Sequence, residues 1–452
     1  MRALVFLVAL TATAAHAQTF TTLVNFTGTS GAAPGANPVY GSLAQGTSGD
    51  LYGMTVDGGP IGRGAVFAMS LEGQYKTLFS LNYPQGYFPE NGLLLAADGM
   101  FYGTASNGGA NLFGTVFVCV PGGTVTALHS FDETDGFNPY SALAQAFNGA
   151  LYGTTLDGGA NGGGSVYQIT TSGTLTTVHS FSGADGDGPT QGPIQASNGL
   201  LYGTAQGGGQ YGDGAVYSIS LSGAFTLLHS FDYTDGSEAW PALVEGTDGN
   251  FYGLTAGGGA KGLGTVYRIT PAGALTTLHN FQGPDGETPY SPLIQGTDGD
   301  LYGMTPLGGA NGYGTIFKIT PGGALTTLHS FAITEGQEPW GSLFQATDGN
   351  FYGMTWHGGT NNDGTIFRLS VGLGPFVRTV PTFGIRGGTA VILGTALTGT
   401  SSVTFNGMAA AFTVLSPTAI TATVPPGATT GTVQVATPSG TLKSNVPFGV
   451  LR

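Results

Sequence analysis

The chain has 452 residues with 82 glycines and 24 prolines, and only 8% of its residues are charged. Hydrophobic residues still make up 40%, which excludes a disordered chain, and the net charge of −14 argues against nucleic acid as a partner. Helix formers are scarce, while Thr, Tyr, Phe and Val are common, so the composition predicts a large all-β protein.

The first 17 residues have the pattern of a secretory signal peptide. A positive start at Arg2 precedes an apolar run, and Ala15-His16-Ala17 forms a small-x-small cleavage site. The alternative is a buried N-terminal strand. No later stretch has the length of apolar residues that a membrane helix needs, so we expect an exported mature chain, residues 18–452, without a membrane-spanning segment. The single cysteine, Cys119, cannot form an internal disulfide, and we expect it to be a small buried hydrophobe.

A period of 50 residues organises most of the chain. Tyr-Gly recurs seven times, at Tyr52, Tyr102, Tyr152, Tyr202, Tyr252, Tyr302 and Tyr352. One copy predicts four short strands, which are 291–296, 300–305, 314–320 and 325–331. Two-residue Asn-Gly or Asp-Gly loops, such as Asp98-Gly99, separate the first two strands and predict type I′ turns with positive φ at both positions. Four antiparallel strands in about 50 residues are typical of a propeller blade.

The strand count predicts a closed ring. The last copy ends near Leu369 without a fourth strand, whereas a matching strand, residues 21–26, precedes the first copy. We therefore predict a seven-bladed β-propeller over residues 18–370, in which the N-terminal strand is the outer strand of the last blade. The alternative, an open solenoid, would need atypical capping repeats.

A second module follows the repeats. Residues 371–375 read as a Gly- and Pro-punctuated linker, and residues 376–452 predict a small β-sandwich. The predicted strands are 390–393, 402–405, 411–415, 420–424, 432–436 and 447–450. Turn signals between them include Asn406-Gly407 and Pro438-Ser439-Gly440.

Two family resemblances follow from these segments. Residues 301–331, from Leu-Tyr-Gly-Met-Thr to Leu-His-Ser-Phe, resemble the GloVer (Gloeo/Verruco) tandem repeat of bacterial exported proteins, and the resemblance covers residues 21–370. Residues 388–394, 403–407 and 421–425 resemble an IPT/TIG immunoglobulin-like domain. The first resemblance implies no activity, and the second implies a spacer or adhesive module. The family's repeats precede C-terminal anchors, whereas this chain ends at Leu451-Arg452 without one, so we expect release from the cell.

Catalytic and cofactor motifs are not evident in the sequence. Gly207 to Gly212 matches a dinucleotide pattern, but the segment that follows it is a predicted strand rather than a helix. A histidine recurs on the fourth predicted strand at His129, His179, His229, His279 and His329. Outer strands of neighbouring blades cannot converge on one metal ion, so we interpret these histidines as a repeated packing solution. No loop has a calcium signature, so we predict no cofactor, with calcium an unsupported alternative.

The candidate ligand residues lie in two loops of each repeat that should share one face. Aromatic residues precede the first strand at Tyr40, Tyr140, Trp240, Tyr290 and Trp340. Acidic residues followed by glycine stand at Asp135, Asp185, Asp235, Asp285 and Glu335. The loops after the second strand add Asp57, Asp157, Trp356 and His357, which break the repeat. Rings beside carboxylates can stack on sugars and bond their hydroxyls; alternatively, the acids form turns and the rings fill wedges between blades.

We therefore expect a secreted, monomeric, non-enzymatic binding or adhesion protein whose loop face binds a polysaccharide or an envelope ligand. One alternative is a polysaccharide lyase or hydrolase that acts at the channel mouth. Another is a purely structural scaffold at the cell surface.

Overall fold

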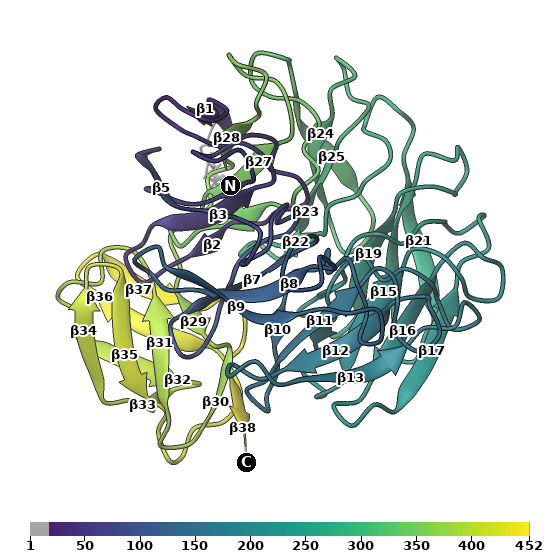
Figure 1. The fold of residues 1–452 in the computed structure, drawn as a ribbon. Helices are drawn as coiled ribbons and strands as arrows, with labels where there is room; N and C mark the ends of the chain where they lie inside the picture. Colours follow the sequence, from purple (N-terminus) through teal and green to yellow (C-terminus); the bar gives the residue numbers. More distant parts are fainter. Residues whose placement is uncertain (1–17, 452) are drawn as a thin grey trace, which may run out of the picture.

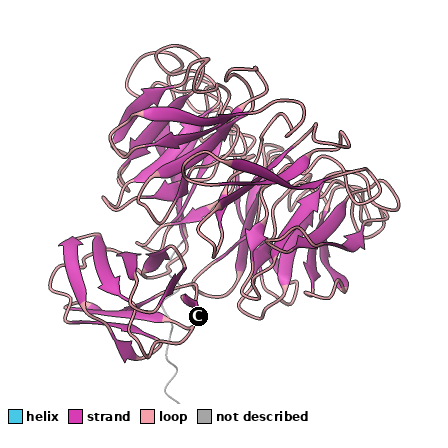
Figure 2. Ribbon diagram, turned by 60° about the horizontal axis from the view of Figure 1, so that its bottom comes forward, coloured by secondary structure: helices cyan, strands magenta, loops and turns pink. Residues whose placement is uncertain are grey.

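The computed structural model describes residues 18–451. Every secondary-structure element in that range is a β-strand (Figure 2). The all-β prediction is therefore confirmed. Seven four-stranded antiparallel sheets repeat along residues 19–370 in a propeller-like arrangement (Figure 1). The predicted signal peptide, residues 1–17, lies outside the described residues.

Each sheet has an inner, a second, a third and an outer strand. The inner strands are β2 (Ala44–Gln45), β6 (Leu94–Leu95), β10 (Ala144–Gln145), β14 (Ile194–Gln195), β18 (Val244–Glu245), β22 (Ile294–Gln295) and β26 (Phe344–Gln345). The second strands are β3 (Leu51–Thr55), β7 (Phe101–Ala105), β11 (Leu151–Thr155), β15 (Leu201–Ala205), β19 (Phe251–Thr255), β23 (Leu301–Thr305) and β27 (Phe351–Thr355). The third strands are β4 (Ala65–Met69), β8 (Thr115–Cys119), β12 (Ser165–Ile169), β16 (Ala215–Ile219), β20 (Thr265–Ile269), β24 (Thr315–Ile319) and β28 (Thr365–Ser370). The outer strands are β5 (Tyr75–Ser80), β9 (Val125–Ser130), β13 (Leu175–Ser180), β17 (Phe225–Ser230), β21 (Leu275–Asn280), β25 (Leu325–Ser330) and β1 (Thr19–Asn25). We number the sheets 1 to 7 in this order, so that sheet 7 contains β26 to β28 and β1.

The Tyr-Gly repeat follows from packing around the second strand, which is buried along its whole length. In sheet 6 a side chain at Gly303 would place its Cβ 2.6 Å from the ring of Phe317 on the neighbouring strand, so that only glycine fits. Cys119 is buried in β8, as expected for a small hydrophobic residue. Burial raises the pKa of its thiol to about 11.

Two local predictions need correction. The inner strand is two residues long rather than six, because only Ile294 and Gln295 pair with the second strand, opposite Tyr302 and Leu301. The turns between the first two strands are not type I′. Of Asp98 and Gly99 only Gly99 has positive φ (80°), and its N–H donates to the carbonyl of Ala96 (3.0 Å). This is a type I turn that ends in a left-handed glycine.

Glutamine side chains join one sheet to the next. In sheet 3 the Oε1 atom of Gln145 accepts from the N–H of Ala97 in sheet 2 (2.8 Å), while its Nε2 donates to Gly149 (3.1 Å). The same contact recurs around the repeats and includes Thr347 of sheet 7, whose N–H donates to Gln45 of sheet 1 (3.1 Å). Leu95 occupies the equivalent position in sheet 2 and has no polar atom to accept from sheet 1.

The first strand pairs with the last sheet. β1 lies antiparallel to β28, with Thr19 opposite Ser370 and Asn25 opposite Thr365, which confirms the predicted partner of the N-terminal strand (Figure 1). A buried apolar cluster then connects sheet 7 to sheet 1, and it includes Val24, Phe26 and Phe67. The two ends of the repeat region therefore share both hydrogen bonds and a core.

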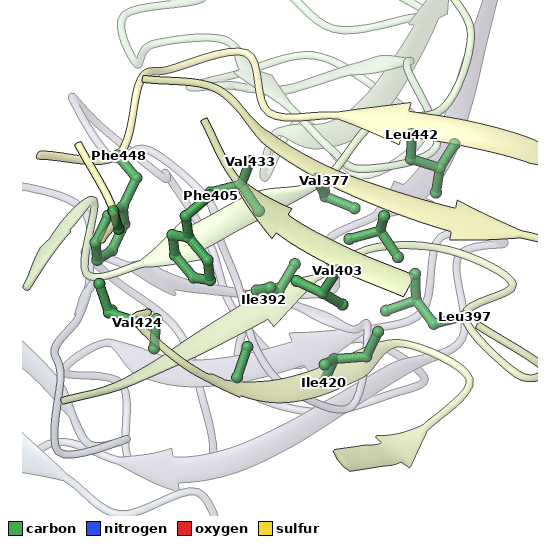
Figure 3. Close-up of a cluster of buried hydrophobic side chains, with 14 residues drawn as sticks. Val377, Ile392, Leu397, Val403, Phe405, Ile420, Val424, Val433, Leu442 and Phe448 are labelled. Atoms are coloured by element: carbon green, nitrogen blue, oxygen red, sulfur yellow. The ribbon is translucent and has the colours of Figure 1, made fainter. Parts of the chain in front are cut away.

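The remaining strands pair only among themselves. They are β29 (Arg378–Val380), β30 (Phe383–Ile385), β31 (Thr389–Leu393), β32 (Ser402–Phe405), β33 (Met408–Ala409), β34 (Phe412–Ser416), β35 (Ala419–Thr423), β36 (Val433–Thr437), β37 (Gly440–Lys443) and β38 (Gly449–Leu451). They form two four-stranded sheets and one parallel pair, β30 with β38. Side chains from both sheets, including Ile392, Phe405 and Ile420, interlock in one core (Figure 3).

Five of the six predicted C-terminal strands match within one residue at each end, and the last begins two residues later than predicted. The short strands β29, β30, β33 and β37 were not predicted. The Asn406-Gly407 turn has positive φ at both residues (46° and 83°), as the sequence predicts. Among residues 18–451, no helix is long and apolar enough to cross a bilayer.

Candidate functional site

Two loops of each repeat share one face, which we name the loop face. The loop before the inner strand forms isolated β-bridges with the loop after the second strand, as between Phe137 and Asp157 and between Gln337 and His357. The predicted placement of these loops on the same side is therefore confirmed.

A backbone bend with positive φ precedes the aromatic position, shortly before the chain enters the inner strand. A residue other than glycine has φ near +50° to +57° in six repeats, at Asn37, Phe88, Asn138, Glu238, Thr288 and Glu338. Such left-handed residues cost roughly 1–2 kcal/mol each and mark positions that their surroundings hold in place. The first repeat has one extra residue between its proline and Leu43, and Tyr40 itself takes φ 45° there.

Carboxylates of the loop face hold these bends. Asp57 accepts from the side chain of Asn37 (3.1 Å), and Asp157 accepts from that of Asn138 (3.0 Å). His357 makes the corresponding contact with Glu338, at 3.4 Å between Nδ1 and Oε2. These three side chains thus hold the residues with positive φ that precede the aromatic position. They are Asp57, Asp157 and His357.

Rings from four sheets meet on the loop face. Tyr40 stacks on Trp240, with centroids 6.2 Å apart, and meets Trp340 edge-on at 5.7 Å. Tyr290 lies between both tryptophans, 5.3 Å from Trp240 and 4.7 Å from Trp340. The chain of contacts continues through Trp356 to His357. We call this group the aromatic cluster: Tyr40, Trp240, Tyr290, Trp340, Trp356 and His357.

A carboxyl group replaces the ring in the second repeat. Glu90 occupies the position equivalent to Tyr140 and Trp340, and its Oε2 atom is buried without a hydrogen-bond partner among residues 18–451. Burial raises the pKa of Glu90 to about 8, Asp57 raises it further, and Ser106 opposes the shift. Glu90 is therefore mainly protonated at pH 7 and can donate a hydrogen bond.

Amide side chains complete this polar side of the face. Asn91 donates to the carbonyl of Tyr140 (2.8 Å) and to Oε1 of Gln191 (3.1 Å). Burial raises the pKa of Tyr140 to about 12, with smaller contributions from Glu90 and Asp157. Tyr140 thus belongs to the side that carries Glu90 and contacts no ring of the aromatic cluster in the described structure.

A small cavity lies at this point. It has a volume of about 130 Å³ and is lined by Tyr40, Asn91 and Gln191 together with inner-strand residues. The indole N–H of Trp340 is also buried without a partner among residues 18–451. An unpaired donor and the unpaired oxygen of Glu90 therefore accompany the ring surfaces, which is the combination that ligand sites present.

The acidic residues of the Asp-Gly turns take a different role. Asp185, Asp235 and Asp285 each hold a histidine of the outer strand of their own sheet, at 2.9, 2.7 and 2.7 Å from His179, His229 and His279. Burial alone would raise the pKa of Asp185, but hydrogen bonds from Ser182 and His179 outweigh it and lower the pKa. These three carboxylates therefore lie with the outer strands and not with the aromatic cluster.

The repeated histidines also pack against rings. His179 stacks on Phe225 of the next sheet, with centroids 4.1 Å apart. His129 and His329 likewise hold acids, Asp135 at 2.7 Å and Glu335 at 3.1 Å. Among residues 18–451 no three His, Cys, Asp or Glu side chains could hold a metal ion together.

Sequence comparison places the repeats in a family. A family model for the Gloeobacter/Verrucomicrobia repeat matches residues 8–202 and 189–411. The chain belongs to the Gloeobacter/Verrucomicrobia repeat family. The resemblance of the repeats to this family is therefore confirmed. No curated protein matches this Gloeobacter/Verrucomicrobia repeat chain in sequence.

Solved structures resemble the Gloeobacter/Verrucomicrobia repeat chain in fold. Two are extracellular domains of proteins described as hybrid two-component systems of Bacteroides thetaiotaomicron, both 14% identical, with TM-scores of 0.50 and 0.51 over 77% and 89% of this chain. The chain spans only 39% and 50% of their lengths. A fungal alcohol oxidase in complex with copper is 14% identical, with a TM-score of 0.52 over 94% of this chain and 100% of its own. At these identities the likeness shows the fold alone.

Sequence reasoning missed three residues of the site in this repeat protein, Glu90, Asn91 and Gln191. The signal was available, since Glu90 stands where five other repeats carry Tyr or Trp. Its departure from the repeat marks it as clearly as Trp356 and His357 were marked.

Proposed function

We propose that the seven sheets form a closed seven-bladed propeller over residues 18–370. The β1–β28 ladder within sheet 7 supports closure, because it joins the first strand to the last repeat. Two contacts between sheet 7 and sheet 1 also support it: the Thr347–Gln45 bond and the apolar cluster around Phe26. The carbonyl of Leu23 in sheet 7 lies against Gly73 in sheet 1. In the same way, the carbonyl of Leu278 in sheet 5 lies against Gly323 in sheet 6. The first-to-last seam thus repeats the chemistry of the internal seams.

We further propose that the chain is an exported bacterial protein with an IPT/TIG-like module at residues 376–452, joined through the linker 371–375. The leader pattern at residues 1–17 supports export. Two four-stranded sheets over one apolar core agree with an immunoglobulin-like sandwich, and the sequence pattern of residues 388–425 favours the IPT/TIG type. We propose that the chain acts outside the cell as a monomer.

We propose that the loop face binds a polysaccharide or a related envelope ligand without transforming it. The observation that carries this proposal is the meeting of the aromatic cluster with Glu90 at one place, where the repeat symmetry is broken. Indole and phenol rings offer flat apolar surface for sugar faces. Protonated Glu90, the amide of Gln191 and the unpaired N–H of Trp340 offer hydrogen bonds to hydroxyl groups.

Replacing Trp240 by Ala is expected to weaken polysaccharide binding by at least about tenfold, because central aromatic residues dominate binding energies. Ligands are first found on a glycan array and then titrated by calorimetry. Tyr211→Ala is the matched control, since Tyr211 is an exposed ring in a loop of the same face and outside the cluster. Thermal melting of both variants checks the fold. If no glycan binds the wild-type protein, the carbohydrate proposal fails, and self-assembly at rising concentration would favour a scaffold.

A hydrolase or lyase is the second candidate, and Glu90 favours it. A carboxyl group protonated near neutral pH, close to the ionisable Asp57, has the pattern of a general acid with its base. Wild-type protein would then release reducing or unsaturated sugar ends from a bound polysaccharide. Glu90→Gln would abolish this release while the polysaccharide still binds, because the amide can donate a hydrogen bond but cannot transfer a proton as an acid. Binding of a polysaccharide by the wild-type protein without any release supports the non-enzymatic function.

A further inference from the structure

A second cavity lies among the inner strands and adjoins the small cavity of the loop face, with which it shares Ser42 and Ser342. It has a volume of about 400 Å³ and is bounded by inner strands β2, β6 and β26 on one side and by residues 378–383 on the other. Contacts between the turns of the sheets and the C-terminal module frame it, including Thr418 to Thr47 (2.9 Å) and Phe376 to Thr347 (3.1 Å). Its size falls within the range of about 300–1,000 Å³ typical of small-molecule sites.

Arg378 places a positive charge in this cavity. Its guanidinium donates one hydrogen bond to the carbonyl of Gln345 (3.1 Å) and lies 4.4 Å from the centre of the Phe344 ring. No carboxylate within residues 18–451 forms an ion pair with it. Arg378 is partly buried, and burial lowers its pKa to about 10. A guanidinium has five N–H donors, so most of its capacity is free for an anion.

One residue of β29 supplies the charged group of this cavity. Thr379 borders the cavity but lies opposite Ile392, which belongs to the core of the C-terminal module, so its side chain lies on that core face and not beside the guanidinium. Arg378, one residue earlier, lies on the other face of the strand and contacts Phe344 and Gln345. The unpaired donors of this one guanidinium therefore indicate a ligand with acceptor oxygens.

The rest of the lining is mainly apolar. Leu43, Leu93, Leu95, Leu343 and Phe383 contribute hydrocarbon surface, and glutamines of the inner strands occupy the edge. Phe383 also meets Phe147 of sheet 3 edge-on, with centroids 4.9 Å apart, which fixes the wall. The cavity thus has one cationic side chain, Arg378, and an otherwise mainly apolar lining.

We propose that this cavity binds a small monocarboxylate with a hydrocarbon body, whose carboxylate pairs with Arg378. A bidentate carboxylate satisfies the guanidinium, and the hydrocarbon part displaces water from the leucine side chains. The bound molecule touches both the propeller-like region and the C-terminal module, so it holds the two together. The site is distinct from the aromatic cluster, because no residue of that cluster lines this cavity.

Calorimetric titration of the full chain with octanoate tests the proposal, with octanamide as a neutral probe of the same length. Octanoate is expected to bind at least about tenfold more tightly than octanamide, because charge-assisted hydrogen bonds add strength that the amide cannot supply. Arg378→Gln should remove this preference, whereas Arg386→Gln, at an exposed arginine of the same module, should retain it.

The acid–amide comparison uses the wild-type protein and stands even where Arg378→Gln fails to fold. Equal affinity for both probes, absence of octanoate binding, or an undiminished preference in folded Arg378→Gln would each overturn the proposal. Binding of octanoate should also raise the melting temperature of the wild-type protein, in proportion to the logarithm of its concentration above saturation.

Discussion

A chain that begins at Gly28 is expected to aggregate and to melt at least about 10 °C below a chain that begins at Gln18. Loss of β1 removes Val24 and Phe26 from the cluster between sheets 7 and 1, and burial of such side chains contributes roughly 1.5–3 kcal/mol each. It also removes the outer partner of β28 and exposes a row of unpaired backbone groups on that strand.

Light scattering and differential scanning calorimetry on the two truncated chains measure this effect. A synthetic peptide of residues 18–27 provides the control, since it should pair with β28 in trans and restore the monomer. If the shorter chain stays monomeric with an unchanged melting temperature, the ring is not closed by the first strand. Rescue by a peptide of scrambled sequence would equally speak against specific pairing.

Glu90→Gln is expected to stabilise the protein at pH 8 to 9, by on the order of 3 kcal/mol, and to change little at pH 4. The pKa of Glu90 is raised from 4.5 to about 8 in the folded protein, so between these values the native state holds a proton that the unfolded chain releases. Wild-type stability therefore falls as the pH rises through this window. The neutral amide has no such dependence.

Chemical denaturation across pH 4 to 9 checks this prediction. Glu133→Gln is the control, because it removes an equal charge from an exposed position. Burial lowers the pKa of His329, so wild type and both variants alike lose stability as the pH falls below about 6.5, and this acid limb cancels in the comparison. Parallel curves for Glu90→Gln and wild type at pH 8 would contradict the burial of the carboxyl group.

Sequence periodicity predicted the second, third and outer strands closely because their spacing is set by packing that every repeat shares. Leu301–Thr305 and Thr315–Ile319 match the prediction to one residue. The inner strand was overestimated because backbone pairing is limited to Ile294 and Gln295, and the alternation of apolar residues does not reveal how far the backbone pairs. The turn at Asp98-Gly99 was misassigned because a dipeptide does not show how many residues the loop contains.

The candidate site was predicted in part for a related reason. Repeat position brought Tyr40, Trp240 and Trp340 together, since equivalent residues of a ring face the same axis. The same reasoning could not show that Asp185 is taken by His179, because both recur with the period and either could face a ligand. Glu90 was not predicted because departures from the repeat were considered in the loops after the second strand and not at the aromatic position before the inner strand.

Pairing of Thr19 with Ser370 also determines when sheet 7 can form during synthesis and folding. A ribosome makes the outer strand of sheet 7 first and its partner last, so the earliest structured residues must wait through the synthesis of every other repeat. Contacts between such remote segments slow folding, because the intervening loop has to close before they form. Sheet 7 is therefore completed after its neighbours, and the chain acquires its final cooperativity only when the whole repeat array is present.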